Sequence, residues 1–190
     1  MAYVRILYCW FVLPHLQINL ARLCGSGGDA CPTAQSSITS YNWGANLAVD
    51  GLDTTWCETA NEANPWWRVE LPFGAALTSI MVLPRSDQWK GRIDNFHAYI
   101  GNSQDYTGNT LCAANVRVFT AAAVQVPCSG VGRYLHIVLQ KTDYLNVLEV
   151  QVFGSLHVSV IVLSEYTCLM NTWYISKSNT HTHLLTTPTV

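Results

Sequence analysis

Charged residues are scarce in this sequence. They make up 12% of its 190 residues, against roughly 25% in a typical soluble domain. The 10 basic and 12 acidic residues give a net charge of −2, and the basic ones form no block. Binding to nucleic acid depends on clustered Lys and Arg that neutralise phosphates. We therefore expect no nucleic-acid partner.

Long apolar runs and catalytic motifs are also missing. No run approaches the ~20 apolar residues that a membrane-spanning helix needs, so no membrane span is expected. There is no GxSxG elbow, no HExxH pair and no phosphate-binding glycine loop ahead of a helix. The acidic residues are scattered mostly at turns and offer no obvious pair for glycoside hydrolysis. His97 and His136 lie within strand patterns, so a binding module is expected in place of an enzyme.

The 7 cysteines contain no CxxC pair, which argues against a zinc ribbon or a thioredoxin-type site. So many cysteines suit an oxidising compartment. Arg5 is followed by an apolar run over residues 6–13 that ends at Pro14. This makes residues 1–17 a candidate signal peptide, with a buried strand as the alternative, and predicts a secreted, extracellular protein.

Short strand patterns separated by turn signals fill most of the chain. Apolar runs at residues 66–71 and 77–83 flank Gly74, and residues 96–100 alternate apolar and polar side chains. Further strand patterns cover residues 134–139 and 147–153. No segment has a convincing helical repeat, so we predict an all-β, antiparallel β-sandwich over residues 19–154. The composition changes after Gly154, which predicts a poorly structured tail over residues 155–190.

Residues 85–92 hold the most concentrated set of candidate binding groups. Arg85 and Arg92 place guanidinium forks on either side of a turn, and Asp87 between them can hold the forks by charge-assisted hydrogen bonds. Trp89 adds an apolar face on which the less polar side of a sugar can rest. The alternative is a purely structural ion pair between Arg85 and Asp87, and this stretch alone favours neither interpretation.

Asp50, Asp53 and Glu149 are candidates for a cation site. Carboxylates are the hard oxygen donors that calcium requires, and a loop of Asp, Gly and Thr can add backbone carbonyls. The alternative is that the aspartates only stabilise turns, since Asp50 and Gly51 form a strong turn signal.

Seven segments in a fixed order resemble the fucolectins, which are F-type lectins related to the discoidin domains of coagulation factors. This resemblance covers residues 19–154. It implies a jelly-roll β-sandwich without catalytic activity, which binds L-fucose through loops at one end and is stabilised by calcium. The segments are LAVDG (47–51), NPWWRVEL (64–71), RSDQWKGR (85–92), YIGNS (99–103), LCA (111–113), GRYLHIVL (132–139) and LNVLEVQVFG (145–154).

The sugar-binding pattern of the fucolectins is H-x26-R-x-D-x4-R/K, and its second half corresponds to Arg85, Asp87 and Arg92. Counting back 26 intervening residues from Arg85 reaches Glu58 in place of the histidine. Alignment on the neighbouring cysteine would offer Thr59 instead. A carboxylate can only accept hydrogen bonds when it is ionised, so Glu58 changes the polarity of the site.

Two adjacent cysteines that pack on the sugar in the family correspond here to Gln88 and Trp89. We expect Trp89 to take their place, and sugars other than fucose become plausible ligands. The predicted partners are glycans, fucosylated or related, in a role of innate recognition, and a homo-oligomer is a further expectation. One alternative is a discoidin-like adhesion domain that binds protein or phospholipid surfaces and has a degenerate sugar site. Another is an accessory module of a glycoside hydrolase.

The resemblance also implies a disulfide and a metal site. It pairs Cys112 with Cys128, and it leaves Cys57 either free or paired with Cys24 or Cys31. It assigns the carboxylates of a calcium site to Asp50 and Glu149. The backbone carbonyls expected to complete that site belong to Leu47, Leu52, Trp56 and Leu148.

Overall fold

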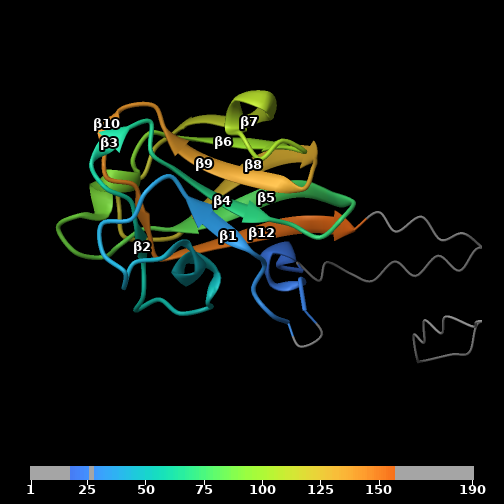
Figure 1. Cartoon of the computed structure of the whole chain (residues 1–190), viewed down its shortest axis with the longest axis horizontal. Coiled ribbons are helices and arrows are strands. Elements are labelled where there is room, and N and C mark those ends of the chain that lie inside the picture. The colour runs from blue at the N-terminus through green and yellow to red at the C-terminus, as the bar shows by residue number, and fades with distance from the viewer. Residues whose placement is uncertain (1–17, 26–27, 157–190) are drawn as a thin grey trace, which may run out of the picture. The chain divides into compact units, whose positions relative to one another are not determined.

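The computed structural model describes residues 18–25 and 28–156, so the candidate signal peptide and the predicted tail from residue 157 onward lie outside the described residues. Two antiparallel sheets form a sandwich (Figure 1). The predicted all-β, antiparallel fold is therefore confirmed. The first sheet contains, in spatial order, β1 (Thr33–Gln35), β4 (Trp66–Glu70), β9 (Tyr134–Leu139), β6 (Phe96–Gly101) and β7 (Thr110–Val116). The second contains β12 (Glu149–Leu156), β5 (Ala75–Leu83) and β8 (Val124–Val131).

Short elements connect the strands of the sandwich. Two small antiparallel pairs join β10 (Thr142–Asp143) to β3 (Glu62–Ala63) and β11 (Asn146–Val147) to β2 (Cys57–Glu58). The helices of the described residues are all short 3-10 turns, and none has the length and hydropathy of a membrane-crossing helix. They are η1 (Leu20–Arg22), η2 (Ala45–Val49), η3 (Lys90–Ile93) and η4 (Tyr106–Gly108).

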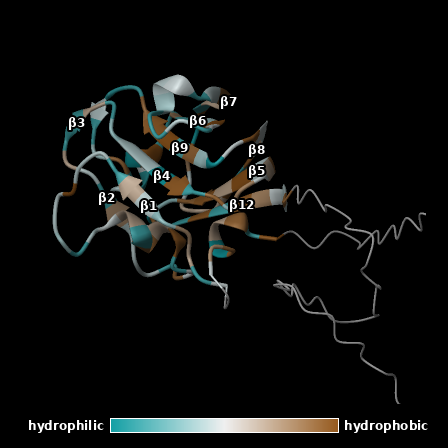
Figure 2. Ribbon diagram, turned by 45° about the vertical axis from the view of Figure 1, so that its right-hand side comes forward, coloured by the Kyte–Doolittle hydropathy of each residue, from teal (hydrophilic) through white to brown (hydrophobic). Residues whose placement is uncertain are grey.

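The core lies between the two sheets because alternate side chains of each strand point inward. In β4, Trp67 and Val69 are fully buried, whereas Trp66 and Arg68 on the opposite face are only half-buried. The strand prediction for this segment is therefore confirmed. Figure 2 shows hydrophobic residues along the central strands and more hydrophilic loops around them. Fully buried residues from both sheets that share this core include Ile80, Val82, Leu135, Ile137, Leu139, Val150 and Val152.

The sandwich continues two residues beyond its predicted end. β12 pairs with β5 as far as Leu156, and the register shifts between Phe153 and Gly154. A Cβ atom on Gly154 would lie 2.0 Å from the carbonyl oxygen of Ala76. Gly154 is thus required for the close approach of two strands. Ser155 and Leu156, which were predicted to belong to the tail, extend β12.

Two disulfides are present in the described residues. Cys112–Cys128 joins β7 to β8 and so links the two sheets, as the resemblance implied. Cys24–Cys31 closes the small glycine-rich loop. Cys57 is buried with a free thiol, which decides between the alternatives for its pairing. Burial raises the pKa of the Cys57 thiol to about 12.

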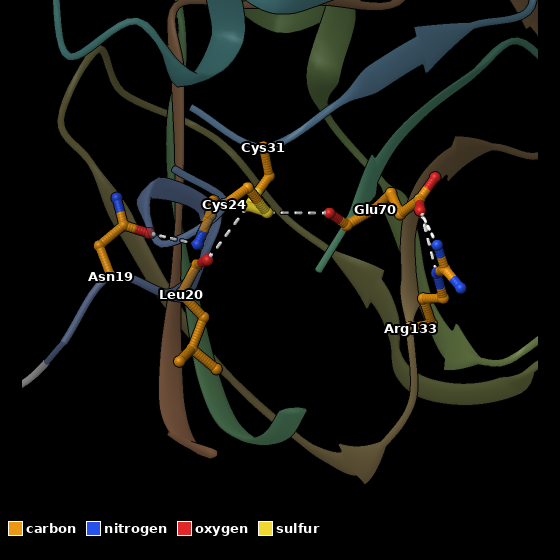
Figure 3. The surroundings of a disulfide bond; sticks show 7 residues. Asn19, Leu20, Cys24, Cys31, Glu70 and Arg133 are labelled. Atoms are coloured by element: carbon orange, nitrogen blue, oxygen red, sulfur yellow. Dashed lines mark hydrogen bonds and ion pairs between the residues drawn. A yellow bond between two sulfur atoms is a disulfide. The ribbon is translucent and has the colours of Figure 1, made fainter. Parts of the chain in front are cut away.

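The Cys24–Cys31 loop is fixed against the sandwich (Figure 3). Sγ of Cys31 lies 3.4 Å from the carbonyl oxygen of Leu20, and Sγ of Cys24 lies 3.6 Å from that of Glu70. The side chain of Glu70 pairs with Arg133, the residue before β9. The loop therefore contacts both η1 and the end of β4, away from residues 85–92.

Candidate functional site

Glu58 lies at the centre of the predicted binding residues. The pairing of β2 with β11 places Glu58 opposite Asn146. Its side chain is nearly buried, and Oε2 accepts hydrogen bonds from Nη1 of Arg85 at 3.1 Å and Nη1 of Arg92 at 3.0 Å. Nδ2 of Asn146 donates a third hydrogen bond to the same oxygen at 3.2 Å. We call Glu58, Arg85, Asp87, Trp89 and Arg92 the arginine cluster.

Thr59, the alternative equivalent of the family histidine, is turned away from this cluster. Its hydroxyl donates to the carbonyl oxygen of Ala60 and accepts a hydrogen bond from the backbone N–H of Leu145 at 2.9 Å. The side chain is fully buried by these contacts. The structure therefore places Glu58, and not Thr59, beside the two arginines.

The predicted ion pair between Arg85 and Asp87 is present. Nε and Nη2 of Arg85 donate to the two carboxylate oxygens of Asp87 at 3.1 and 2.5 Å. Oδ1 of Asp87 also accepts the backbone N–H of Trp89 at 3.1 Å, which fixes the turn. The hydrogen bond from Arg85 is the main reason that the pKa of Asp87 lies below its usual value. Arg85 is thus held by two carboxylates, those of Asp87 and Glu58.

Aromatic rings pack against both guanidinium groups. The guanidinium carbon of Arg92 lies 4.1 Å from the ring centroids of both Trp89 and Tyr144. That of Arg85 lies 4.1 Å from the ring centroid of Trp56. Such cation–π contacts restrict the arginines to one orientation. Trp89 remains 44% exposed, so part of its ring is open to a ligand.

The arginine cluster combines donors, acceptors and apolar surface without a net charge, because two guanidinium groups face two carboxylates. Nη1 is the only guanidinium nitrogen of Arg92 that donates to another of the described residues. Its remaining N–H groups and the half-exposed carboxylate of Asp87 are available to a ligand. Such a surface suits a neutral polyhydroxylated molecule, whose hydroxyl groups both donate and accept hydrogen bonds.

Three contributors to the cluster were not predicted as such. Trp56 was expected to supply only a backbone carbonyl, whereas its ring packs on Arg85. Tyr144 and Asn146 were not singled out at all, although both contact cluster residues. No spacing in the sequence links residues 144–146 to residues 85–92. Two strand pairings bring them together: β11 with β2, which carries Glu58, and β12 with β5, which sets Glu149 opposite Leu83.

The predicted cation residues occupy a second loop. Asp50 ends η2, and Gly51 follows with φ +82°, a conformation that favours glycine. The carboxylate of Asp50 accepts hydrogen bonds from the backbone N–H of Leu52 at 2.9 Å and the hydroxyl of Thr55 at 2.7 Å. Asp53 is exposed and makes no comparable contact among the described residues. Asp50 therefore does stabilise this turn.

Glu149 points toward the same turn. Its Oε2 accepts the backbone N–H of Gly51 at 3.2 Å, whereas Oε1 is buried without a hydrogen-bond partner among the described residues. Burial, followed by repulsion from Asp50, raises the pKa of Glu149 to about 7. A buried carboxylate oxygen without a partner, next to a second carboxylate, fits a hard cation. No group of three or more His, Cys, Asp or Glu side chains gathers in the described part of the chain, so backbone carbonyls would have to supply most of the ligands.

The sequence matches the family described as the F5/8 type C domain over residues 32–150. It is 34% identical to Fucolectin-5 of Anguilla japonica over 131 residues, which is 67% of each chain. It is 33% identical to Fucolectin-1 of the same organism over 76% of this chain and 85% of that protein.

Solved structures of the same fold agree with these matches. A fucolectin from serum of the striped bass, Morone saxatilis, has a TM-score of 0.61 and 30% identity, covering 66% of this chain and 45% of that chain. The lectin domain of lectinolysin, solved with the Lewis B antigen, has a TM-score of 0.59 and 26% identity, covering 73% and 97%.

The fold and these matches define the chain as an F5/8 type C, discoidin-like module. Within that class it belongs to the fucolectins, a family of non-catalytic, carbohydrate-binding lectins.

Proposed function

We propose that this protein is a lectin that binds fucosylated or closely related glycans through the arginine cluster. The observation that carries the proposal is the convergence of Arg85 and Arg92 on Glu58, within 3.1 Å of one carboxylate oxygen and beside Trp89. The lectin domain of lectinolysin was solved with the Lewis B antigen, and it shares this fold.

Each group of the cluster has a distinct role in this proposal. The N–H groups of Arg92 that Glu58 does not engage donate to sugar hydroxyls or to the ring oxygen, and Asp87 keeps the fork of Arg85 in position. The exposed part of the Trp89 ring packs on the apolar side of the sugar.

Glu58 distinguishes this site from one with a histidine. Its Oε2 already accepts three hydrogen bonds, from Arg85, Arg92 and Asn146. The carboxylate thus competes with the ligand for the N–H groups of the arginines. This competition lowers the affinity for a sugar that must accept hydrogen bonds from both Arg85 and Arg92. In return, Oε1 can accept a hydrogen bond from a sugar hydroxyl. The expected ligand therefore donates to Glu58 and accepts from Arg92.

We further propose that calcium stabilises the protein at the loop of Asp50 and Glu149. These two carboxylates would hold the ion, and its positive charge would offset the repulsion between them. The carbonyl groups proposed to complete the site belong to Leu47, Leu52, Trp56 and Leu148.

Secretion is part of the proposal as well. The two disulfides suit an oxidising, extracellular environment, where such bonds persist. Residues 1–17 are the proposed targeting segment. Expression of the full chain in secretory cells tests this, with recovery from the medium as the expected result.

A glycan array probed with the full chain tests the lectin function. We expect retention on fucosylated glycans, including Lewis B, and loss of at least tenfold in affinity for Arg92→Ala. Arg117→Ala is the matched control, because Arg117 also pairs with an aspartate and packs on an aromatic ring but lies outside the cluster. Absence of binding by the folded wild-type protein to every glycan would reject the proposal.

An adhesion domain with a degenerate sugar site is the second candidate. One observation favours it: both arginines already donate hydrogen bonds to Glu58, which leaves fewer of their N–H groups for a sugar. Under this alternative the chain would bind a protein or phospholipid surface, and Arg85→Ala would leave that binding largely intact. Under the lectin proposal the same substitution abolishes glycan retention.

A further inference from the structure

A pocket lies on the outer face of the five-stranded sheet, the face turned away from the core. Its volume is about 450 Å³, within the range of roughly 300–1,000 Å³ that is typical of small-molecule sites. Trp66 belongs to this face because its neighbour Trp67 points into the core. None of the lining residues belongs to the arginine cluster. They are Trp66, Gln104, Asp105, Tyr106 and Thr107.

Hydrogen bonds from His136 and Arg68 hold the wall of this pocket in place. Nε2 of His136 lies 3.2 Å from the carbonyl oxygen of Gln104, and Nδ1 lies 3.3 Å from Nδ2 of Asn109. A carbonyl oxygen can only accept a hydrogen bond and the amide NH2 of Asn109 donates one, so the imidazole proton is on Nε2 and Nδ1 is the acceptor. Burial lowers the pKa of His136 to about 4, so the ring is neutral near pH 7. Arg68 donates a further hydrogen bond to Gln104 O at 2.6 Å. The loop over residues 104–107 is thus preorganised.

Aromatic and polar groups meet in this pocket. The rings of Trp66 and Tyr106 both pack against His136, with centroid distances of 6.1 and 6.3 Å. Asp105 accepts the backbone N–H of Thr107 at 3.0 Å, and this hydrogen bond lowers the pKa of its carboxyl. Asp105 is thus ionised near pH 7. The guanidinium of Arg68, 5.6 Å from the ring centroid of Trp66, offsets this charge, so the pocket carries no net charge and suits a neutral ligand.

We propose that this pocket is a second carbohydrate subsite that takes one neutral pyranose ring. Trp66 and Tyr106 offer the apolar surface on which the C–H face of a sugar packs. Asp105 and Thr107 offer an acceptor and a hydroxyl for sugar hydroxyl groups. The subsite works independently of the arginine cluster, so one chain can hold two sugar residues and gain avidity on a dense glycan surface.

Nuclear magnetic resonance with the full chain tests this subsite. The probe is methyl β-D-galactopyranoside, which carries C–H groups on one face because its 4-hydroxyl is axial. We expect saturable shifts of the Trp66 indole N–H and of the amides of residues 104–107, with Kd on the order of 1–10 mM. The same shifts persist in Arg92→Ala, which disables the arginine cluster. Failure of the lectin proposal would therefore leave this result unchanged.

Two variants locate the binding. Tyr106→Ala removes a half-exposed ring and should weaken binding by about fivefold or more. Trp66→Phe keeps most of the packing against His136 and should weaken it by about twofold to fivefold. Resonances elsewhere in the spectrum report whether each variant is folded. The proposal is overturned if the wild-type resonances do not shift, if Arg92→Ala abolishes the shifts, or if folded Tyr106→Ala binds as well as wild type.

Discussion

Glu58 and Arg92 are 34 residues apart in the sequence, yet Oε2 of Glu58 lies 3.0 Å from Nη1 of Arg92. The same oxygen accepts a hydrogen bond from Arg85. The side chains of Glu58, Arg85 and Arg92 are only 5%, 12% and 17% exposed. One carboxylate therefore joins two arginines where water screens their charges poorly, so this contact contributes to both stability and ligand choice.

Replacement of Glu58 tests its contribution to stability. Glu58→Gln leaves the two guanidinium groups without their shared negative charge and should lower the free energy of unfolding by about 3 kcal/mol. Glu70→Gln is the matched control, because Glu70 pairs with a half-exposed arginine, and should cost less than about 1 kcal/mol. Urea unfolding measures both. Similar small losses for the two variants would contradict the prediction.

Trp89 offers a test of the proposed apolar contact with sugar. Trp89→Ala should weaken binding to a fucosylated glycan by about tenfold, because the ring supplies packing surface and orients Arg92. Phe119→Ala provides the control, since Phe119 is also an exposed aromatic residue and packs on Arg117 outside the cluster. Isothermal titration calorimetry measures both. Unchanged affinity in Trp89→Ala would exclude this ring from the site.

Calcium should raise the thermal stability of the protein. At a calcium concentration of 100 times Kd the expected gain is about 2.7 kcal/mol. Asp50→Asn and Glu149→Gln should abolish the gain, whereas Asp53→Asn should retain it because Asp53 is exposed and apart from the buried carboxylate. Scanning calorimetry with calcium and with EDTA measures the difference. An equal loss in Asp53→Asn would show that the site was wrongly assigned.

His136 predicts a dependence of stability on pH. Its pKa falls from 6.5 to about 4 on folding, so between these values the unfolded chain binds more protons than the native protein. The resulting stabilisation is fully present above pH 6.5 and is lost as the pH falls toward 4. His136→Gln should flatten the dependence of the unfolding free energy on pH in this window. An unchanged slope would show that His136 makes no such contribution.

Cys57 should be chemically inert in the folded protein. Its thiol is fully buried, and burial raises its pKa to about 12, so almost no thiolate is present near neutral pH. Iodoacetamide should therefore label Cys57 only after denaturation. Peptide mapping by mass spectrometry distinguishes this cysteine from the others, and rapid labelling of the native protein at Cys57 would contradict the expectation.

The fold followed from the sequence because its signals are local. Alternating burial in β4 and β5, and turn residues such as Gly51 and Gly74, are set by neighbours within a few positions. The contact between Arg85 and Asp87 was likewise predictable, since they lie only two positions apart in the chain. The resemblance to fucolectins added the Cys112–Cys128 disulfide, which no local pattern determines.

By itself the sequence determined an antiparallel sandwich and a turn that carries two arginines and an aspartate. Only the tertiary structure decided that Glu58, and not Thr59, contacts those arginines, and that Tyr144 and Asn146 complete their surroundings. The physical reason is that the pairing of β2 with β11 joins segments 88 residues apart, and the pairing of β12 with β5 sets Glu149 opposite Leu83, just before Arg85. Hydrogen-bond register between distant strands fixes which side chains meet, and no spacing along the chain records it.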